Sequence, residues 1–142
     1  MTEPCVFCDI VAGTVPSCKV YEDADTLAFL DIGPLVEGHT LVIPKPHYDP
    51  LTATPPAVLH RVIEVVQRIA DAQMRGLAAD GVNVMQSNGR VAGQVVPHLH
   101  FHVIPRFQHD GHSWNWNARA YGRPGDMQSL ADRLRQALTR AP

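Results

Sequence analysis

Short apolar runs, each bounded by turn residues, follow one another along the first three quarters of the chain and predict β-strands. These runs occupy residues 19–21, 26–32, 39–43, 81–87 and 95–106. The sequence Pro44-Lys-Pro46 ends the third run, because proline cannot continue inside a sheet. A shorter apolar segment, residues 5–12, stops at Gly13 and predicts a brief helical turn ahead of the first strand.

Between the third and fourth runs, apolar residues recur every three or four positions, which is the period of an amphipathic helix. This helix is expected to run to about Arg75, with Gly76 as its stop. The apolar stripe consists of Val58, Leu59, Val62, Ile63, Val66, Ile69 and Ala70. A second stripe predicts a C-terminal helix over residues 127–140, and residues 108–125 are expected to be irregular.

The order of these elements indicates the fold class. Strands followed by a helix and then by two neighbouring strands favour a hairpin and an antiparallel sheet over an alternation of strands and helices. We therefore predict an α+β fold with a five-stranded antiparallel sheet, one long helix and a C-terminal helix. A length of 142 residues predicts a single domain over residues 1–142.

Composition narrows the classes of partner. The net charge of −2 argues against a protein that binds nucleic acid. No apolar run has the length of a membrane span, and the N-terminus lacks the basic and apolar regions of a signal peptide. The sequence therefore predicts a cytoplasmic protein that does not bind membranes.

Histidine is the unusual residue of this composition, because eight are present against twelve lysines and arginines together. His98, His100 and His102 alternate with apolar residues and so share one face of the predicted fifth strand. Three interpretations compete: incidental histidines on a polar surface, ligands of a catalytic metal ion, or nucleophilic attack of an imidazole on phosphorus. For the third, the loop 88–95 offers an amide side chain and backbone N–H groups that can hold phosphate oxygens.

The stretch Gly93-Gln-Val-Val-Pro-His98-Leu-His100-Phe-His102-Val-Ile-Pro105 resembles the signature of the histidine triad family of nucleotide hydrolases and transferases. Further similar stretches are Cys5-Val-Phe-Cys-Asp-Ile10, Val20-Tyr-Glu-Asp, Ala28-Phe-Leu-Asp-Ile32 and Gly38-His-Thr-Leu-Val-Ile-Pro-Lys45. The resemblance covers about residues 5–107, and residues 108–142 form a variable tail that is not diagnostic.

This resemblance implies a different role for each of the site residues. His100 would attack the α-phosphorus and become nucleotidylated, His102 would contact the phosphate and assist the leaving group, and His39 would support both. The residues implied in nucleotide binding are Asp31, Ile32, Asn88, Gly93, Gln94 and Val95. Asp31 suits the ribose, because a carboxylate can accept hydrogen bonds from both hydroxyls. Val95 is a departure, since relatives often carry Ser or Thr there, and leaving-group preference therefore stays undefined.

Cys5 and Cys8 form a C-x-x-C pair, which in a reducing compartment suggests a metal or redox site before a disulfide. The resemblance implies that they form a closed, four-coordinate structural zinc site with His47 and His98. A regular strand would put His98 on the same face as His100, but its place at the start of the strand leaves it able to turn toward the cysteines. The alternative is a reduced, metal-free pair without a function.

The implied function is that of a nucleotide hydrolase or transferase acting on adenosine phosphoramidate-type substrates through a nucleotidyl-histidine, with no catalytic metal. The expected partners are a purine nucleotide such as AMP or an AMP derivative, and a second copy of the chain in a homodimer. Three alternatives stay open: a dinucleoside polyphosphate hydrolase, a metal-dependent hydrolase with the three histidines as ligands, and a non-catalytic nucleotide-binding protein.

Overall fold

The computed structural model describes residues 3–114 and 117–140 of the chain. The chain separates into two compact units, residues 1–112 and residues 113–142. The first unit holds every strand and all the residues to which the sequence assigns chemistry, and the second holds one helix. The extent of the domain, which the sequence places at residues 1–142, stays a prediction.

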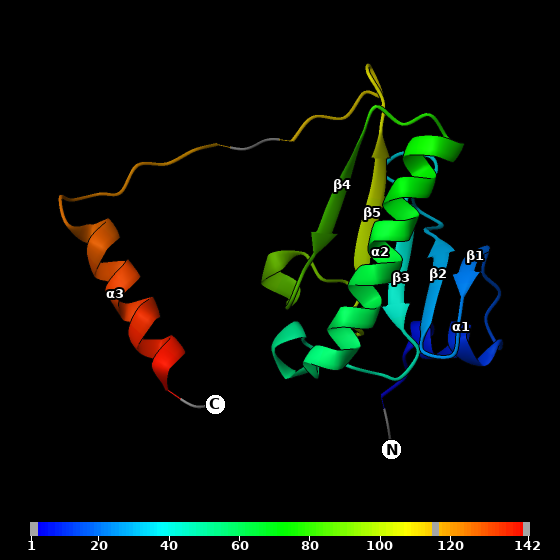
Figure 1. Ribbon diagram of the computed structural model, residues 1–142, viewed down its shortest axis with the longest axis horizontal. Helices are drawn as coiled ribbons and strands as arrows, with labels where there is room; N and C mark the ends of the chain where they lie inside the picture. The colour runs from blue at the N-terminus through cyan, green and yellow to red at the C-terminus, as the bar shows by residue number, and fades with distance from the viewer. Residues whose placement is uncertain (1–2, 115–116, 141–142) are drawn as a thin grey trace. The chain divides into compact units, whose positions relative to one another are not determined.

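Five strands form one antiparallel sheet in the first unit (Figure 1). They are β1 (Lys19–Glu22), β2 (Thr26–Leu30), β3 (Thr40–Pro44), β4 (Gly81–Gln86) and β5 (Phe101–Arg106). Their spatial order is β1-β2-β3-β5-β4, so β5 pairs with β4 on one side and with β3 on the other. The predicted α+β fold with a five-stranded antiparallel sheet is confirmed.

Alternate residues of β2 face opposite sides of the sheet, and each side is covered by a helix. Leu27 and Phe29 pack in one buried cluster with α1 (Val6–Ala12), whereas Ala28 packs in the other with α2 (Pro56–Gly76). Figure 1 shows the long helix α2 crossing its face of the sheet. The sheet therefore has an apolar layer on both faces, and the N-terminal helix α1 is part of the core.

The buried face of α2 differs in part from the predicted stripe. Its buried residues are Val62, Val65, Val66, Ile69 and Gln73. Ile63 belongs to the predicted stripe but is 47% exposed. The sheet contacts a narrower arc of the helix than the apolar pattern spans, and that arc includes a glutamine at the position where the apolar stripe would continue.

The fifth strand is shorter than predicted, because residues 95–100 are not part of it. A 3-10 turn, η2 (Arg90–Ala92), and Pro97 precede β5, and the N–H of Leu99 donates to the carbonyl oxygen of Tyr48 at 2.7 Å. The backbone N–H of Leu99 is therefore bonded to the loop that contains Tyr48, and it does not continue the pairing of β5 with β3. Of the three histidines predicted to share one face of this strand, only His102 lies within β5, and His98 and His100 precede it.

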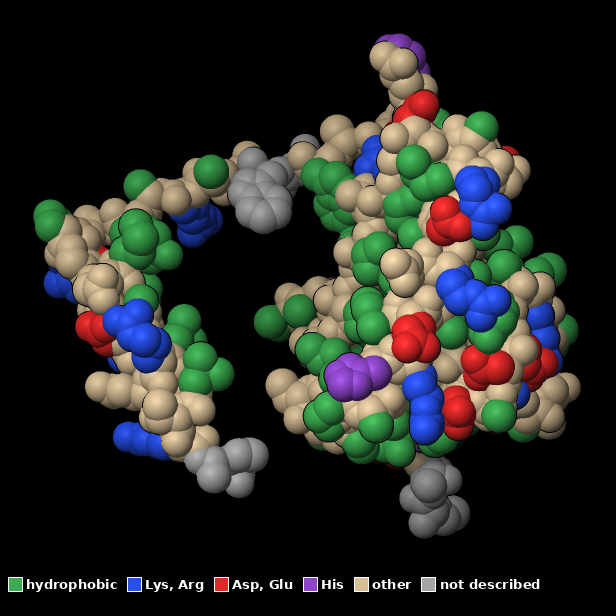
Figure 2. Space-filling view, in the orientation of Figure 1, with side chains coloured by type: hydrophobic (Ala, Val, Ile, Leu, Met, Phe, Trp, Pro, Cys, Tyr) green, Lys and Arg blue, Asp and Glu red, His purple; other side chains and the backbone are tan. Residues whose placement is uncertain are grey.

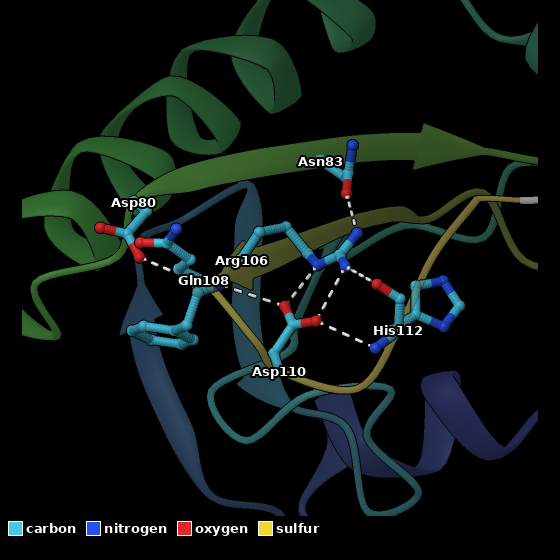
Figure 3. Close-up of polar contacts among 7 residues, drawn as sticks. Asp80, Asn83, Arg106, Gln108, Asp110 and His112 are labelled. Carbon is cyan, nitrogen blue, oxygen red and sulfur yellow. Dashed lines mark hydrogen bonds and ion pairs between the residues drawn. The ribbon is translucent and has the colours of Figure 1, made fainter.

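Arg106, the last residue of β5, holds the segment that follows the strand (Figure 3). Its Nε and Nη2 donate to the two carboxylate oxygens of Asp110 at 2.7 and 3.0 Å, and its Nη1 donates to Asn83 Oδ1 on β4 at 2.9 Å. Hydrogen bonds from Arg106 and from the N–H groups of Phe107 and His112 hold the pKa of Asp110 well below its usual range. Bidentate pairing of this kind fixes direction as well as distance, so the end of the first unit is tied to the sheet.

The second unit contains α3 (Asp126–Thr139), which is close to the predicted C-terminal helix. None of its described residues is buried, and its apolar stripe is exposed at Met127, Leu130, Leu134 and Leu138. In the face of the molecule shown in Figure 2, acidic and basic side chains are interspersed. Over residues 3–114 and 117–140, no helix has the length and apolar character needed to cross a membrane.

Candidate active site and metal centre

The backbone of the residue two positions earlier orients His100. Nδ1 of His100 lies 2.6 Å from the carbonyl oxygen of His98, and because a carbonyl oxygen can only accept, Nδ1 carries the proton. The other ring nitrogen, Nε2, therefore carries the lone pair. The residue is 6% exposed and borders a cavity of about 390 Å³. A neutral imidazole with one free nitrogen is thus held beside a cavity of a size suited to a small ligand.

His39 and His102 form a hydrogen-bonded pair whose proton positions follow from a backbone donor. The N–H of Leu35 donates to His39 Nδ1 at 3.1 Å, so this nitrogen is an acceptor and His39 carries its proton on Nε2. That Nε2 lies 2.8 Å from His102 Nδ1, which must then accept. His102 therefore carries its own proton on Nε2, and the pair presents an N–H donor next to His100, whose ring centroid is 5.0 Å away.

Burial favours the neutral form of His39, His100 and His102, because it lowers the pKa of each ring. Desolvation lowers the pKa of His100, and the hydrogen bond to the carbonyl of His98 opposes this only in part. The pKa of His102 falls to about 4, through burial first and then through the neighbouring His100 and His39. Burial also lowers the pKa of His39, against the attraction of the Asp31 carboxylate, whose Oδ2 lies 3.7 Å from His39 Nε2. The neutral ring is the form that can attack phosphorus.

The cavity beside His100 and His102 has an apolar wall and an acidic edge. Residues that form the apolar wall include Val6, Phe7, Ile10, Phe29 and Val96. Asp31 and Ile32 also border the cavity, but in the bend after β2 and not within the strand that the sequence predicts there. The carboxylate of Asp31 accepts a hydrogen bond from the N–H of Gly33 at 2.8 Å, which fixes it at the edge.

Two of the predicted nucleotide-binding side chains brace neighbouring loops. Gln94 accepts from the N–H of Gly89 through Oε1 and donates through Nε2 to Asp49 Oδ1, both at 2.7 Å. Asn88 accepts from the N–H of Leu51 through Oδ1 at 2.8 Å. Both amides are therefore engaged inside the protein, and neither residue lines the cavity.

The backbone donors expected to hold phosphate oxygens are also used inside the loop. The N–H of Gly93 donates to the carbonyl of Arg90 at 2.9 Å, and the N–H of Gln94 donates to that of Gly89 at 3.2 Å. The tight turn at η2 therefore uses the N–H groups of Ala92, Gly93 and Gln94 within the loop, which an open glycine loop would not do. Gly93 and Val95 do border the cavity.

Four candidate metal ligands from three parts of the chain meet at the start of α1. Cys5 Sγ and Cys8 Sγ lie 3.4 and 3.6 Å from His98 Nδ1, and His47 Nδ1 lies 3.4 Å from Cys8 Sγ. The four ligand atoms all lie within 4.8 Å of one another. Tetrahedral zinc, with Zn–S near 2.3 Å and Zn–N near 2.0 Å, holds its ligand atoms about 3.5 Å apart. The donor set and spacing therefore fit a zinc ion.

His98 belongs to this cluster and not to the row of His100 and His102. Its Nε2 lies 2.9 Å from the carbonyl oxygen of Pro44, so Nε2 carries the proton and Nδ1 faces the cysteines with its lone pair. A backbone carbonyl on the second nitrogen is the usual partner of a metal-binding histidine. Burial and then the neighbouring Cys5 raise the pKa of the Cys8 thiol to about 11, so a metal that binds here displaces a proton.

The geometry argues against a metal held by all three histidines of the triad. Among the described residues, the second group with metal-ligand spacing is Asp31, His39 and His102. Two of its ligand atoms, His39 Nε2 and His102 Nδ1, are already hydrogen-bonded to each other. His100 belongs to neither group, which leaves its free nitrogen for other chemistry.

Phe7 is a site residue that the sequence pattern does not reveal. Its ring stands edge-on to the rings of His100 and His98, with centroids 5.1 and 5.9 Å apart. Phe7 lies in α1 between Cys5 and Cys8, so the cluster that holds the helix also holds the side chain packed on His100. Its place between the two cysteines is the only signal in the sequence that could have drawn attention to it.

Comparison with known proteins connects this geometry to a family. The HIT domain model matches residues 12–109. The crystal structure of a member of the HIT family of proteins from Bacillus subtilis is similar with a TM-score of 0.90 and 39% identity, over 98% of this chain and 100% of that one. A zinc-bound histidine triad family protein from Mycobacterium smegmatis gives a TM-score of 0.72 and 40% identity, over 94% and 96% of the two chains.

Two curated relatives carry the names of activities. A Candida albicans protein named adenosine 5'-monophosphoramidase is 42% identical over 106 residues, which cover 72% of this chain and 70% of that protein. An Arabidopsis thaliana protein named adenylylsulfatase is 44% identical over 106 residues, which cover 75% of this chain and 54% of that protein. Both names describe cleavage of a bond to an adenosine 5'-phosphate group.

Proposed function

Because this chain belongs to the HIT domain family, we propose that it is a hydrolase of nucleoside phosphate derivatives with His100 as its nucleophile. The observation that supports this most directly is the hydrogen bond from His100 Nδ1 to the carbonyl of His98, which leaves Nε2 as the free nitrogen. The proposed substrate class is adenosine phosphoramidates, in keeping with the name of the Candida albicans relative.

The reaction proceeds by two displacements at phosphorus. In the first, a bond forms between His100 Nε2 and the α-phosphorus while the bond from phosphorus to the leaving nitrogen breaks, and the leaving nitrogen takes up a proton from solvent. In the second, the oxygen of a water molecule bonds to phosphorus while the bond to His100 breaks, and that water gives up a proton to solvent. Over the cycle, one proton of water ends on the amine and the hydroxyl ends on AMP, so His100 returns to its starting tautomer.

His102 and His39 assist as neutral groups. The Nε2–H of His102 donates a hydrogen bond to an oxygen of the phosphate or to the leaving atom, where negative charge develops. His39 keeps this donor in place, because its own Nε2–H occupies Nδ1 of His102 at 2.8 Å. Neutral imidazoles are suited to this task, since burial lowers the pKa of both rings.

The nucleotide would occupy the cavity beside His100. The carboxylate of Asp31 accepts from the ribose hydroxyls, and the exposed Ile32 packs against the base. Phosphate oxygens accept from the backbone N–H groups of Val95 and Val96, which donate to no other backbone group in the described part of the loop. Asn88, Gly93 and Gln94 act in nucleotide binding by setting the shape of that loop.

A structural zinc ion would be held by Cys5, Cys8, His47 and His98 in a closed Cys2His2 site. The zinc-bound Mycobacterium smegmatis structure supports this assignment for a member of the same family. The ion supplies a cross-link between α1 and the loops that carry the two histidines, and it takes no part in the chemistry at phosphorus.

The protein is proposed to act as a homodimer in which the β4 strands of two copies meet. The observation in support is that β4 stands at the edge of the sheet and exposes 48% of Val84. An edge strand has backbone donors and acceptors left over for another strand. Sedimentation equilibrium of the full chain measures the mass, and a monomer at micromolar concentration contradicts this assignment.

The proposed reaction is tested by trapping its intermediate. Wild-type protein mixed with an adenosine phosphoramidate, quenched in alkali within one turnover and digested is expected to carry one AMP on the peptide containing His100. Fragmentation in the mass spectrometer assigns the modified nitrogen to a residue. His102→Asn is the matched variant, because it keeps His100 but removes the Nε2–H that assists the leaving group, so the adduct is expected to form more slowly.

Three outcomes separate the candidate functions. AMP on His100 supports the proposal. AMP release without an adduct in either protein, abolished by a chelator and restored by added metal, indicates a metal-dependent hydrolase. Binding of AMP without turnover of phosphoramidates, dinucleoside polyphosphates or adenylyl sulfate indicates a nucleotide-binding protein.

A further inference from the structure

A buried glutamine on α2 connects the backbone beside His39 to the backbone beside His102. Nε2 of Gln73 donates to the carbonyl oxygen of Gly38 at 3.1 Å and to that of Val103 at 2.9 Å. Gly38 directly precedes His39, and Val103 directly follows His102. One side-chain amide therefore bonds to both of the segments that carry the hydrogen-bonded histidine pair.

Gln73 approaches from the opposite side of the sheet. It lies on α2, which packs on the face that carries Ala28, Val42 and Val103, whereas the cavity is lined by α1. The pairing of β3 with β5 ends at Thr40 and Val103, one residue from His39 and His102. The glutamine thus bridges the two strands at the point where the backbone ladder stops.

The side-chain oxygen of Gln73 is buried without a hydrogen-bond partner in the described part of the chain, which directs attention to the two bonds that its amide nitrogen donates. Gln73 is 4% exposed, and its Oε1 has no hydrogen-bond partner among the described residues. An unpaired buried acceptor destabilises a fold, so the two hydrogen bonds that the Gln73 amide donates have to offset this cost. Turning the amide over would set its oxygen against two carbonyl oxygens, so the N–H groups must face Gly38 and Val103.

The backbone at Gly38 is also closely packed and hydrogen-bonded. Its φ is +97°, and a Cβ there would lie 2.8 Å from Leu77 Cδ1 and 3.1 Å from Pro105 Cγ. The hydroxyl of Thr40 donates to the same carbonyl at 2.9 Å. The segment before His39 is therefore packed beneath the end of α2, where a shift of the helix would reach the histidine.

We propose that Gln73 is a positioning residue for the reaction, because its two hydrogen bonds set the spacing between His39 and His102. The proposal rests on the function proposed above for these histidines. Through the 2.8 Å bond between them, this spacing determines that His102 carries its proton on Nε2 and presents it to the substrate. Without Gln73, the two segments can separate and His102 can exchange between its two neutral tautomers.

The test uses Gln73→Met, which fills a similar volume but removes the N–H donors together with the unpaired oxygen. Nitrogen-15 NMR of the imidazole rings in the free protein reports which nitrogen of His102 is protonated. We expect one tautomer in the wild-type protein and a mixture in the variant. With a phosphoramidate substrate, kcat is expected to fall about tenfold while KM changes less than about twofold.

Ile69→Val is the matched control, since Ile69 is buried on the same helix and has no bond to Gly38 or Val103. It is expected to keep the wild-type nitrogen shifts and kcat, whatever it does to the midpoint of urea unfolding. Gln73→Leu is a second variant in case Gln73→Met does not fold. Failure of both to fold would assign Gln73 to the fold and overturn the inference.

The inference is also overturned if Gln73→Met folds and keeps a single His102 tautomer, or if Ile69→Val changes the tautomer to the same extent. The NMR measurement needs no turnover. If wild-type protein forms no adduct on His100, the proposed reaction fails, while the tautomer of His102 still decides whether Gln73 positions the pair.

Discussion

The ring of Phe7 stands edge-on to the ring of His100, with 5.1 Å between their centroids. Phe7 is itself held between the two cysteines of the candidate metal centre. The proposed nucleophile and the proposed zinc site are therefore in contact through one buried aromatic side chain. Aromatic pairs of this geometry contribute about 0.5–1.5 kcal/mol beyond their buried area.

Metal removal is expected to affect both stability and nucleotide binding. Cys5→Ser should lower the midpoint of thermal unfolding and weaken AMP binding, because α1 lines the cavity and loses its cross-link. Calorimetry with and without zinc measures both effects. Cys18→Ser is the matched control, since Cys18 is exposed and outside the cluster. Less than about half an equivalent of zinc in untagged protein with fully reactive cysteines contradicts the metal assignment.

Replacing Phe7 by leucine keeps most of the buried volume and removes the aromatic edge. Phe7→Leu is expected to cost about 1 kcal/mol of unfolding free energy and to reduce kcat several-fold, because the ring of His100 loses one of its supports. Urea unfolding and steady-state kinetics measure the two effects. An unchanged kcat in a destabilised variant would show that Phe7 serves packing alone.

His100→Ala is expected to abolish turnover and leave the fold intact. The change removes a buried polar ring, and the candidate zinc ligands are untouched because His98 Nδ1, not His100, faces the cysteines. Turnover of a phosphoramidate and the circular dichroism spectrum provide the two measurements. Near wild-type turnover in this variant would remove His100 from the role of nucleophile.

Stability is expected to fall as the solution becomes more acidic. The pKa of His102 is about 4 in the folded chain and 6.5 in its ordinary state, so the unfolded chain binds the extra proton first. The contribution of His102 to the free energy of unfolding has its full value above pH 6.5. It declines as the pH falls toward 4 and no longer changes below that pH. Urea unfolding across this range measures the slope, which should be shallower in His102→Asn. Equal slopes would contradict the lowered pKa.

Val95→Ser tests the departure from the family pattern. Val95 is 87% exposed and borders the cavity, so the change should alter the unfolding free energy by less than about 0.5 kcal/mol. The new hydroxyl can donate to the phosphate or the leaving group. The ratio of kcat/KM for phosphoramidates to that for dinucleoside polyphosphates should therefore change, and an unchanged ratio would show that this position does not affect leaving-group preference.

Local patterns predicted most of the secondary structure. The period of the apolar residues placed the strands and both longer helices, because one face of each element near the core has to be apolar. The same reasoning failed for the buried face of α2. Ile63 is apolar yet exposed, and Gln73 is polar yet buried, since the apolar period does not state which arc of a helix the sheet will cover.

By itself, the sequence predicted the five-stranded α+β fold of this chain. The spacing of its cysteines and histidines also marked them as candidate metal-binding and catalytic residues. The resemblance implied that His98 turns to the cysteines, and the tertiary structure shows the geometry that allows it, because β5 begins at Phe101 and His98 Nδ1 lies 3.4 Å from Cys5 Sγ. The proton positions on His39, His100 and His102 also depend on the fold. Each is set by a hydrogen bond that the folded backbone or a neighbouring ring supplies, and no spacing in the sequence records those bonds.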